Sequence, residues 1–411
     1  MSPVTQAIII GGGPAGLAAA LNLKRTNGID CRIYEIRDKP TTIGGAVNIP
    51  PNGIRLFDQL GLLNAMNARA SSSSSLIKLH QGDSIIAEKN AGEVSKGATG
   101  YGFWRIVRTD MLEVLLSAIE QEDIPIMYGK KITKVTETEN SVEVLFSDGT
   151  RDSAGLLLGC DGIHSSVRRL HVDPMVEPVY SGISNIGTIL PSSKVAFRLD
   201  PALHMTFTSD GLFGFTQCNN SGDRLYWFCS KKVSIPENGD NRDGWEAFGK
   251  NVIEGFKSDT LKVLSPVQGQ WGDQLRETVK ATESISFFPI FKLPPTSKWS
   301  TKRCLLLGDA AHAMQPHVGQ GTSMALEDAF MLSRLLEAYN ETKELSDIFK
   351  VYEEKRRPRV EALSQAAAAS GNVRSKENPN APQSREEVLM AQWRDGTRLQ
   401  DSFYNILEEP I

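Results

Sequence analysis

The stretch Ala7–Gly16, which reads AIIIGGGPAG, decides the fold class of this 411-residue chain. Its first four residues, Ala7–Ile10, are apolar and have the pattern of a buried strand. The glycines that follow, Gly11, Gly13 and Gly16, fit the spacing G-x-G-x-x-G. Because the same spacing also occurs in plain tight turns, the elements around it have to decide between a turn and a nucleotide site.

The elements on both sides of these glycines favour a nucleotide site. Leu17–Leu23 continues the chain as an apolar helix, and Cys31–Tyr34 is a second strand that ends in Glu35. In such a unit, backbone N–H groups approach a pyrophosphate at the helix N-terminus, and the acid accepts hydrogen bonds from a ribose. An acid at position 35 favours an unphosphorylated ribose, which predicts FAD or NAD rather than NADP at this site.

A second glycine-containing stretch, Lys302–Ala329, places a carboxylate beside another helix start. Cys304–Leu307 has the pattern of a buried strand, and Gly308-Asp309 ends it. A polar loop follows, and a helix begins near Thr322. Ligands of doubly wound sheets bind at the carboxyl ends of strands, and helix N-termini favour negative charge. This stretch therefore predicts a polar and partly anionic ligand.

The chain between these stretches changes character twice. Residues 131–159 form a β-meander that leads into Cys160-Asp161-Gly162, and residues 175–290 carry mainly short β-type runs. We expect an α/β fold in which a mainly antiparallel substrate sheet is inserted into a Rossmann-like domain, with a helical C-terminus. The predicted parts are 1–174 and 291–372 for the nucleotide domain, 175–290 for the substrate sheet and 373–411 for a helical extension.

Composition restricts the classes of partner. The net charge of -4 argues against nucleic acid, and no apolar run approaches the ~20 residues that a membrane-spanning helix needs. The five cysteines form no C-x-x-C pair, which indicates neither a disulfide framework nor a zinc site. The basic cluster Lys355–Arg359 has the spacing of a solvated helix face. We expect a cytoplasmic monomer or homodimer without a metal site.

Three motifs in this order resemble the FAD-dependent aromatic hydroxylases, the group of para-hydroxybenzoate and salicylate hydroxylases. They are Gly11–Gly16 with Glu35, Cys160-Asp161-Gly162 running to Arg168, and Gly308-Asp309 with Pro316–Gly321. The resemblance implies non-covalent FAD, with NADH or NADPH as a transient co-substrate. It also implies that Glu35 holds the adenosine ribose, that Arg108 and Asp309 hold the ribityl–pyrophosphate part, and that Asp161 serves both nucleotides. The implied FAD contacts are Gly11, Gly13, Pro14, Ala15, Gly16, Glu35, Arg37, Gly45, Ala46, Val47, Arg108, Asp161, Gly308, Asp309, Gly319, Gly321 and Thr322.

The residues themselves leave some of these roles open. The loop at Gly45 also fits a simple connector, and Arg108 also fits an exposed arginine. On the substrate side we expect Phe215, Gln217 and Trp227 from the sheet, and Pro316 and Gly319 from the loop. Phe215 and Trp227 also fit a packed core, where such residues lie more often than in a site.

The implied reaction is the hydroxylation or epoxidation of an electron-rich aromatic or enol-type compound with NAD(P)H and dioxygen, through a flavin hydroperoxide. A flavin oxidase or reductase of the same superfamily is the alternative, and a catalytically inactive nucleotide-binding scaffold is another. Salicylate hydroxylases often carry an arginine in a tyrosine-arginine-glycine element. Ser184–Thr188 stands there without one and has a local similarity to the tetracycline-inactivating monooxygenases.

Overall fold

A five-stranded parallel sheet forms the centre of the nucleotide domain. The computed structural model describes residues 3–41, 45–234, 253–374, 387, 390–391 and 397–411. Ile9 pairs with Leu158 on one side and with Ile33 on the other, which confirms the strands expected around the first glycine loop. The sheet order is β17 (Cys304–Leu306), β11 (Leu156–Gly159), β1 (Gln6–Ile10), β2 (Asp30–Tyr34) and β7 (Ile126–Met127).

Long helices pack together beside this sheet. The helix α1 (Pro14–Asn27) contacts both α10 (Gly321–Tyr339) and α5 (Arg108–Gln121), and α11 (Leu345–Arg374) contacts α10. Because β1 and the middle of α1 are almost entirely buried, they anchor the glycine loop between them. Apart from α7 and α8, which are described below with the substrate sheet, the further helices are α2 (Pro51–Gln59), α3 (Leu63–Asn67), α4 (Ala91–Thr99), α9 (Asp309–His312) and α13 (Thr397–Gln400). The short helical turns are η1 (Ser73–Ser75), η2 (Arg168–Val172), η3 (Ser192–Lys194), η4 (Pro316–Val318) and η5 (Asp401–Phe403).

Two smaller sheets complete the nucleotide domain. The meander predicted for residues 131–159 is confirmed as β8 (Ile132–Glu137), β9 (Val142–Phe146) and β10 (Arg151–Ala154). A two-stranded ribbon joins β3 (Ala46–Ile49) to β6 (Trp104–Val107), so the loop at Gly45 leads into a defined strand. All five cysteines of the chain are buried and unpaired.

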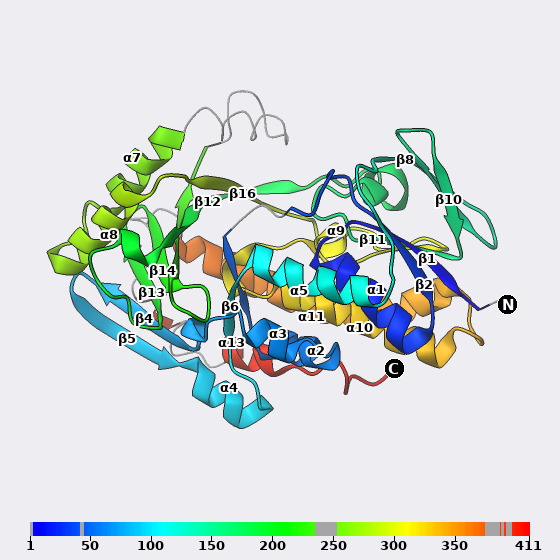
Figure 1. Ribbon diagram of the computed structural model, residues 1–411, viewed down its shortest axis with the longest axis horizontal. Coiled ribbons are helices and arrows are strands. Elements are labelled where there is room, and N and C mark those ends of the chain that lie inside the picture. Colours follow the sequence, from blue (N-terminus) through cyan, green and yellow to red (C-terminus); the bar gives the residue numbers. More distant parts are fainter. Residues whose placement is uncertain (1–2, 42–44, 235–252, 375–386, 388–389, 392–396) are drawn as a thin grey trace.

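The substrate sheet has seven strands and is larger than expected. Figure 1 shows it with its helices at one end of the molecule, away from the parallel sheet. The strands β4 and β5, which lie in the part of the sequence assigned to the nucleotide domain, also join this sheet. The order is β16 (Ser286–Lys292), β12 (Val179–Pro191), β15 (Arg224–Lys232), β14 (Gly211–Gln217), β13 (Leu203–Thr208), β4 (Leu76–Gln81) and β5 (Ser84–Asn90), antiparallel except between β13 and β4.

The two faces of this sheet have different surroundings. One face packs against α7 (Ile253–Leu264) and α8 (Gly269–Ala281), and its side chains are sealed in a second hydrophobic core. Along β15, buried residues alternate with half-buried ones, and the half-buried set includes Tyr226 and Phe228. Since side chains alternate across a strand, the half-buried set lies on the face opposite to the helices.

The C-terminal segment is only partly helical. Within the predicted helical extension 373–411, residues 397–403 form α13 and η5, whereas residues 404–411 lie outside any helix. Asn405 Oδ1 accepts the backbone N–H of Leu407, which removes a donor that a continuing helix would need. No described helix combines the length and the apolar composition needed to cross a membrane.

Candidate active site

The first glycine loop has the backbone geometry of a phosphate cradle. Gly11 has φ +113°, and a Cβ there would collide with the carbonyl of Cys160. A Cβ at Gly16 would collide with the carbonyl of Gly11, whereas a Cβ at Gly13 would have no neighbour within 4 Å. The helix α1 starts at this point without a side-chain cap. Two glycines thus permit close packing, and the third leaves backbone N–H groups open towards a ligand.

Glu35 ties this loop to the end of β2. Its Oε2 accepts the backbone N–H of Gly12 at 2.8 Å, and its Oε1 accepts that of Arg37 at 2.9 Å. The Arg37 guanidinium lies 3.6 Å from the same Oε1. The predicted acid therefore stands directly beside the glycine loop, as a ribose-binding residue must. Pro14 and Ala15 lie half-buried in the first turn of α1.

A second uncapped helix start lies at the beginning of α10. Its first turn has no side-chain cap, Gly321 is exposed and Thr322 is half-buried, so several N–H groups stay available. Gly319 has φ +66°, and a Cβ there would lie 3.1 Å from Asn48 Nδ2 on β3. The loop containing Pro316, which is exposed, therefore meets the β3 ribbon at Gly319.

Asp309 and Arg108 come together from distant parts of the sequence. The Asp309 side chain is exposed, yet the surrounding protein raises its pKa, against the opposing effects of His312 and Arg108. The backbone N–H of Arg108 donates to the carbonyl of Gly45 at 3.2 Å, which attaches the β3 loop to the same place. Val47 continues that ribbon, half-buried.

Asp161 has a structural task in this fold. Its Oδ2 accepts the backbone N–H groups of Ser166 at 2.6 Å and Val167 at 3.2 Å, which fixes the turn after β11. Arg168, two residues further into that segment than Ser166, is buried and donates to the carbonyl of Ala310 at 2.8 Å. The third motif is therefore connected to the Asp309 turn, while contact of Asp161 with a nucleotide stays a prediction.

A buried charge network supports the Asp309 turn from behind. Arg356 is fully buried, and its Nη1 lies 2.7 Å from Glu327 while its Nε lies 2.8 Å from Asp328. Arg359 binds the same Glu327 through two nitrogens at 2.8 Å. The prediction of a solvated basic face was wrong here, because α11 turns both arginines towards acids on α10. The signal was available: Glu327-Asp328 interrupts an otherwise apolar helix.

Asp328 connects this charge network to the turn that carries Asp309. Its Oδ2 accepts the backbone N–H of Gly308 at 2.8 Å and faces Nε2 of His312 at 2.6 Å. Burial disfavours its ionisation, but the charges of His312 and Arg356 outweigh this effect and lower the pKa of Asp328 to about 2. The strand-end turn that presents Asp309 is therefore held from the protein side by an ionised carboxylate.

The substrate-side prediction for the sheet needs a correction. Phe215 and Trp227 are fully buried in the core under α7 and α8, and Trp227 Nε1 donates to Thr282 Oγ1 at 3.0 Å. Gln217 lies on the same face and donates to the carbonyl of Leu199 at 2.8 Å. Phe215 and Trp227 therefore belong to the core under the helices, whereas a substrate contact of the half-buried Gln217 stays a prediction.

The opposite face meets the nucleotide domain. A Cβ at Gly45 would collide with the Tyr226 ring, and Tyr226 packs beside Ala46 and Val107. The Phe228 ring lies over Gly214, where a Cβ would collide with it. A further tie is the ion pair of Arg224 on β15 with Asp110 on α5. The sheet therefore turns Tyr226 and Phe228, rather than Phe215, towards the β3 loop.

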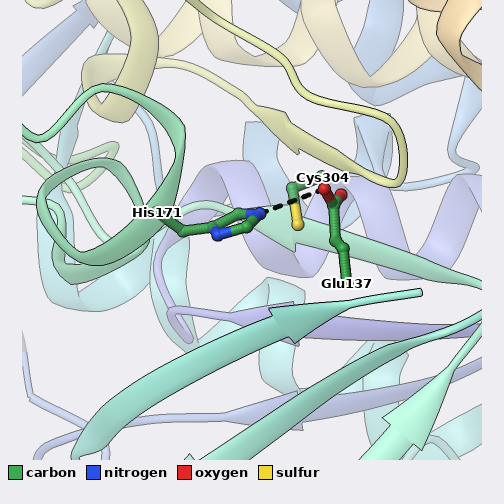
Figure 2. A group of neighbouring side chains, drawn as sticks. All are labelled: Glu137, His171 and Cys304. Carbon is green, nitrogen blue, oxygen red and sulfur yellow. Dashed lines mark ion pairs between the residues drawn. The ribbon is translucent and has the colours of Figure 1, made fainter.

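One group of side chains has the composition of a metal site. Figure 2 shows Glu137, His171 and Cys304, whose ligand atoms lie within 4.8 Å of one another. The Glu137 carboxylate already faces His171 Nε2 at 3.1 Å and accepts from Thr301 Oγ1 and the Arg303 N–H. Burial raises the pKa of the Cys304 thiol, so it stays protonated. The group is a hydrogen-bonded tie between β8, η2 and β17.

The residues described above fit FAD. They comprise an open glycine cradle with an acid beside it, a second uncapped helix start, and an accessible carboxyl and guanidinium between the two. An adenosine ribose, a pyrophosphate and a hydroxyl-bearing ribityl chain require these groups.

Comparisons with known proteins agree with this fit. The family described as FAD binding domain matches residues 4–367. A 6-hydroxynicotinate 3-monooxygenase from Pseudomonas fluorescens is 27% identical over 384 residues, covering 92% of this chain and 94% of the relative. A salicylate hydroxylase from Pseudomonas putida is 28% identical, covering 90% of this chain and 86% of the relative.

Solved structures share the fold. Klebsiella pneumoniae HpxO complexed with FAD and uric acid superposes with a TM-score of 0.80 at 22% identity, over 99% of this chain and 97% of the other. The tetracycline destructase Tet(55) superposes with a TM-score of 0.73 at 20% identity over the whole of both chains. Since the family match spans most of the sequence and these sequence relatives are monooxygenases and hydroxylases, the chain belongs to the FAD binding domain family and is an FAD-dependent monooxygenase.

Proposed function

We propose that this enzyme hydroxylates a flat, electron-rich aromatic or enol-type compound that lies against the face of the substrate sheet carrying Tyr226 and Phe228. The observation that carries this proposal is the burial pattern of β15, in which the side chains under the helices are sealed and the opposite ones stay half-buried. Aromatic side chains that are accessible and face a cofactor loop suit a planar substrate.

The contacts of this face support the assignment. Tyr226 touches the Gly45 loop, and that loop is bound to Arg108, beside Asp309. A substrate on Tyr226 and Phe228 therefore lies next to the Gly45–Val47 segment, which the family resemblance counts among the FAD contacts. The relatives named above act on 6-hydroxynicotinate and salicylate, which are flat and bear a hydroxyl group on the ring.

The chain contributes binding and positioning. FAD, when bound, supplies the redox chemistry, with NAD(P)H as reductant and dioxygen as co-substrate. The uncapped start of α10 at Gly321 favours negative charge beside it, and Asp309 accepts hydrogen bonds from hydroxyl groups. Tyr226 and Phe228 exclude water and hold the acceptor carbon in place. Arg37, Asp161 and the glycines are proposed contacts of the same cofactor.

The test compares the two faces of the sheet. NAD(P)H oxidation by the FAD-loaded enzyme is measured over a panel of phenols, hydroxypyridines and enols, together with hydrogen peroxide released per NAD(P)H consumed. We expect Phe228→Leu to raise the KM for the best substrate and the amount of hydrogen peroxide released per NAD(P)H. The reason is that an acceptor carbon displaced by even ~1 Å slows oxygen transfer. The matched control Phe213→Leu, on the sealed face, should lower stability and leave coupling unchanged. The proposal is rejected if no compound in the panel speeds up NAD(P)H oxidation. It is also rejected if the control Phe213→Leu, and not Phe228→Leu, increases the hydrogen peroxide released per NAD(P)H.

A further inference from the structure

Arg105 on β6 is a buried cation with little compensation. Arg105 is only 7% exposed, and its Nε donates a hydrogen bond to Ser74 Oγ at 3.0 Å. Among the described residues, that hydroxyl is the only hydrogen-bond partner of the guanidinium, which has no carboxylate partner. A guanidinium has five N–H donors, and the Nη donors of Arg105 are not among the buried unpaired atoms, so they stay open to a ligand or to solvent.

An unpaired buried guanidinium destabilises a fold. Removing it from water costs several kcal/mol unless an anion and further hydrogen bonds compensate it. Burial lowers the pKa of Arg105, and the groups that oppose this shift are the phenol of Tyr226 and the thiol of Cys218. Burial also raises the pKa of Tyr226 and raises that of Cys218 to about 12, so both are neutral. No negative charge on these neighbours balances Arg105.

The strand register turns Arg105 towards the substrate sheet. In the β3–β6 ribbon, Asn48 stands opposite Arg105 and Ala46 opposite Val107, so all four side chains share one face. Ala46 and Val107 contact Tyr226 on that face. Arg105 and Asn48 therefore lie on the same side as the open aromatic face of the sheet.

Asn48 provides a second, independent sign of a ligand. Its Oδ1 is buried and has no hydrogen-bond partner in the part of the chain that the structure describes, and its amide nitrogen lies next to Gly319 in the loop before α10. Buried polar atoms are nearly always paired in folded proteins. The unpaired amide oxygen of Asn48 and the guanidinium of Arg105 lie on one face of the β3–β6 ribbon, and Asn48 adjoins the loop that contains Gly319. These groups mark a place where a polar group of a ligand would complete the hydrogen bonding.

We propose that Arg105, assisted by Asn48, binds an anionic oxygen group of the substrate, a carboxylate or an ionised ring hydroxyl. This inference rests on the proposed function and narrows its substrates to planar aromatic anions. A guanidinium fork can bind such an oxygen group through two parallel hydrogen bonds.

Binding experiments can test this assignment with pairs of compounds that differ only in charge. The FAD-loaded enzyme is titrated with 4-hydroxybenzoate and 4-hydroxybenzamide, and with 4-nitrophenolate and 4-nitroanisole, while flavin absorbance reports binding. We expect wild type to prefer the anion in at least one pair, and the pair identifies which oxygen group is bound. Arg105→Met should lose about tenfold to a hundredfold in affinity for that anion and keep its affinity for the neutral analogue.

Further variants separate binding from folding. Arg105→Lys should retain part of the anion preference, and Arg151→Met, which removes an exposed arginine, should retain all of it. Because Arg105 is uncompensated without ligand, Arg105→Met should raise the melting temperature of the FAD-loaded enzyme, whereas loss of a structural arginine would lower it. No anion preference in wild type, or an unchanged preference in Arg105→Met, would overturn the inference. If wild type still oxidises NAD(P)H with neutral phenols, the proposed function survives that failure.

Discussion

Arg356 Nε lies 2.8 Å from Asp328 Oδ1, and both side chains are fully shielded from solvent. The two residues belong to α11 and α10, the long helices that flank the Asp309 turn. The other oxygen of Asp328 accepts the backbone N–H of Gly308. An ion pair between two helices therefore supports, from the protein interior, the turn that carries Asp309, the proposed FAD contact.

Breaking this ion pair should destabilise the enzyme strongly. Arg356→Met leaves Asp328 and Glu327 buried with less compensating charge, and we expect a loss of about 3–5 kcal/mol in unfolding free energy. Urea denaturation of the FAD-loaded protein measures it. The control Arg151→Met breaks an ion pair with Glu143 that is exposed on both sides and should change stability by less than about 1 kcal/mol. Equal effects of the two variants would show that burial of the Arg356 pair is irrelevant.

Removal of the accessible carboxylate should weaken cofactor binding. If Asp309 accepts from hydroxyls of the ribityl chain, Asp309→Ala loses a hydrogen bond to a charged group, which contributes roughly 1.5–3 kcal/mol. We expect FAD affinity to fall about tenfold to a hundredfold, as measured by fluorescence titration of the apoprotein. Asp148→Ala, in the exposed turn between β9 and β10, is the matched control. A folded Asp309→Ala variant that binds FAD as wild type does would refute the assignment.

Acid stability should depend on Glu137. Burial disfavours its charge, but hydrogen bonds from His171, Thr301 and the Arg303 N–H outweigh this effect and lower its pKa to about 2. An unfolded glutamate titrates near ~4.3, so between these values the unfolded chain binds more protons than the folded one. The stabilisation is complete above the unfolded pKa and is lost as the pH falls towards about 2.

Glu137→Gln should therefore flatten the acid limb of the stability curve. Urea midpoints measured at several pH values from neutral to acid give the slope for wild type and variant. Glu143→Gln, on the neighbouring strand β9 and more exposed, should leave the slope nearly unchanged. A variant whose midpoint falls as steeply with acid as that of wild type would assign the acid sensitivity to other carboxylates.

The contact between Gly45 and Tyr226 gives a steric prediction. A methyl group at position 45 would collide with the Tyr226 ring, so Gly45→Ala must displace either the loop that contains Gly45 or the substrate sheet. We expect more hydrogen peroxide per NAD(P)H and a higher KM, with the fold intact by circular dichroism. Gly97→Ala in α4, where a Cβ meets no atom within 4 Å, is the control. Normal coupling in Gly45→Ala would mean that this contact does not align the substrate.

The parts of the fold that depend on local pattern could be predicted from the sequence. Strand β1, the glycine loop and Glu35 lie within a short stretch whose geometry follows from backbone sterics and hydrogen bonding. The orientation of the substrate sheet could not be predicted. Alternation separates Phe215 from Tyr226, but only the position of α7 and α8 decides which of them is sealed.

The burial of charged residues could not be predicted from the sequence either. Arg356 and Arg105 both look like ordinary solvated arginines in the sequence, because the groups around them come from elements far away in the chain. Burial of a charge is a tertiary property, and no local spacing encodes it. The acidic pair Glu327-Asp328 in an apolar helix was the one local sign, since such residues are almost never fully buried without partners.

The sealed cysteines bear on the durability of the enzyme. Enzymes that activate dioxygen release peroxide whenever oxygen transfer fails, and peroxide attacks the thiolate form of cysteine. Burial raises the pKa of Cys31, Cys218 and Cys229 to about 12, and it raises those of Cys160 and Cys304 as well. All five thiols therefore stay protonated and out of reach of solvent. The packing that builds the core also protects the catalyst from its own by-product, so inactivation during uncoupled turnover should leave the free-thiol count unchanged.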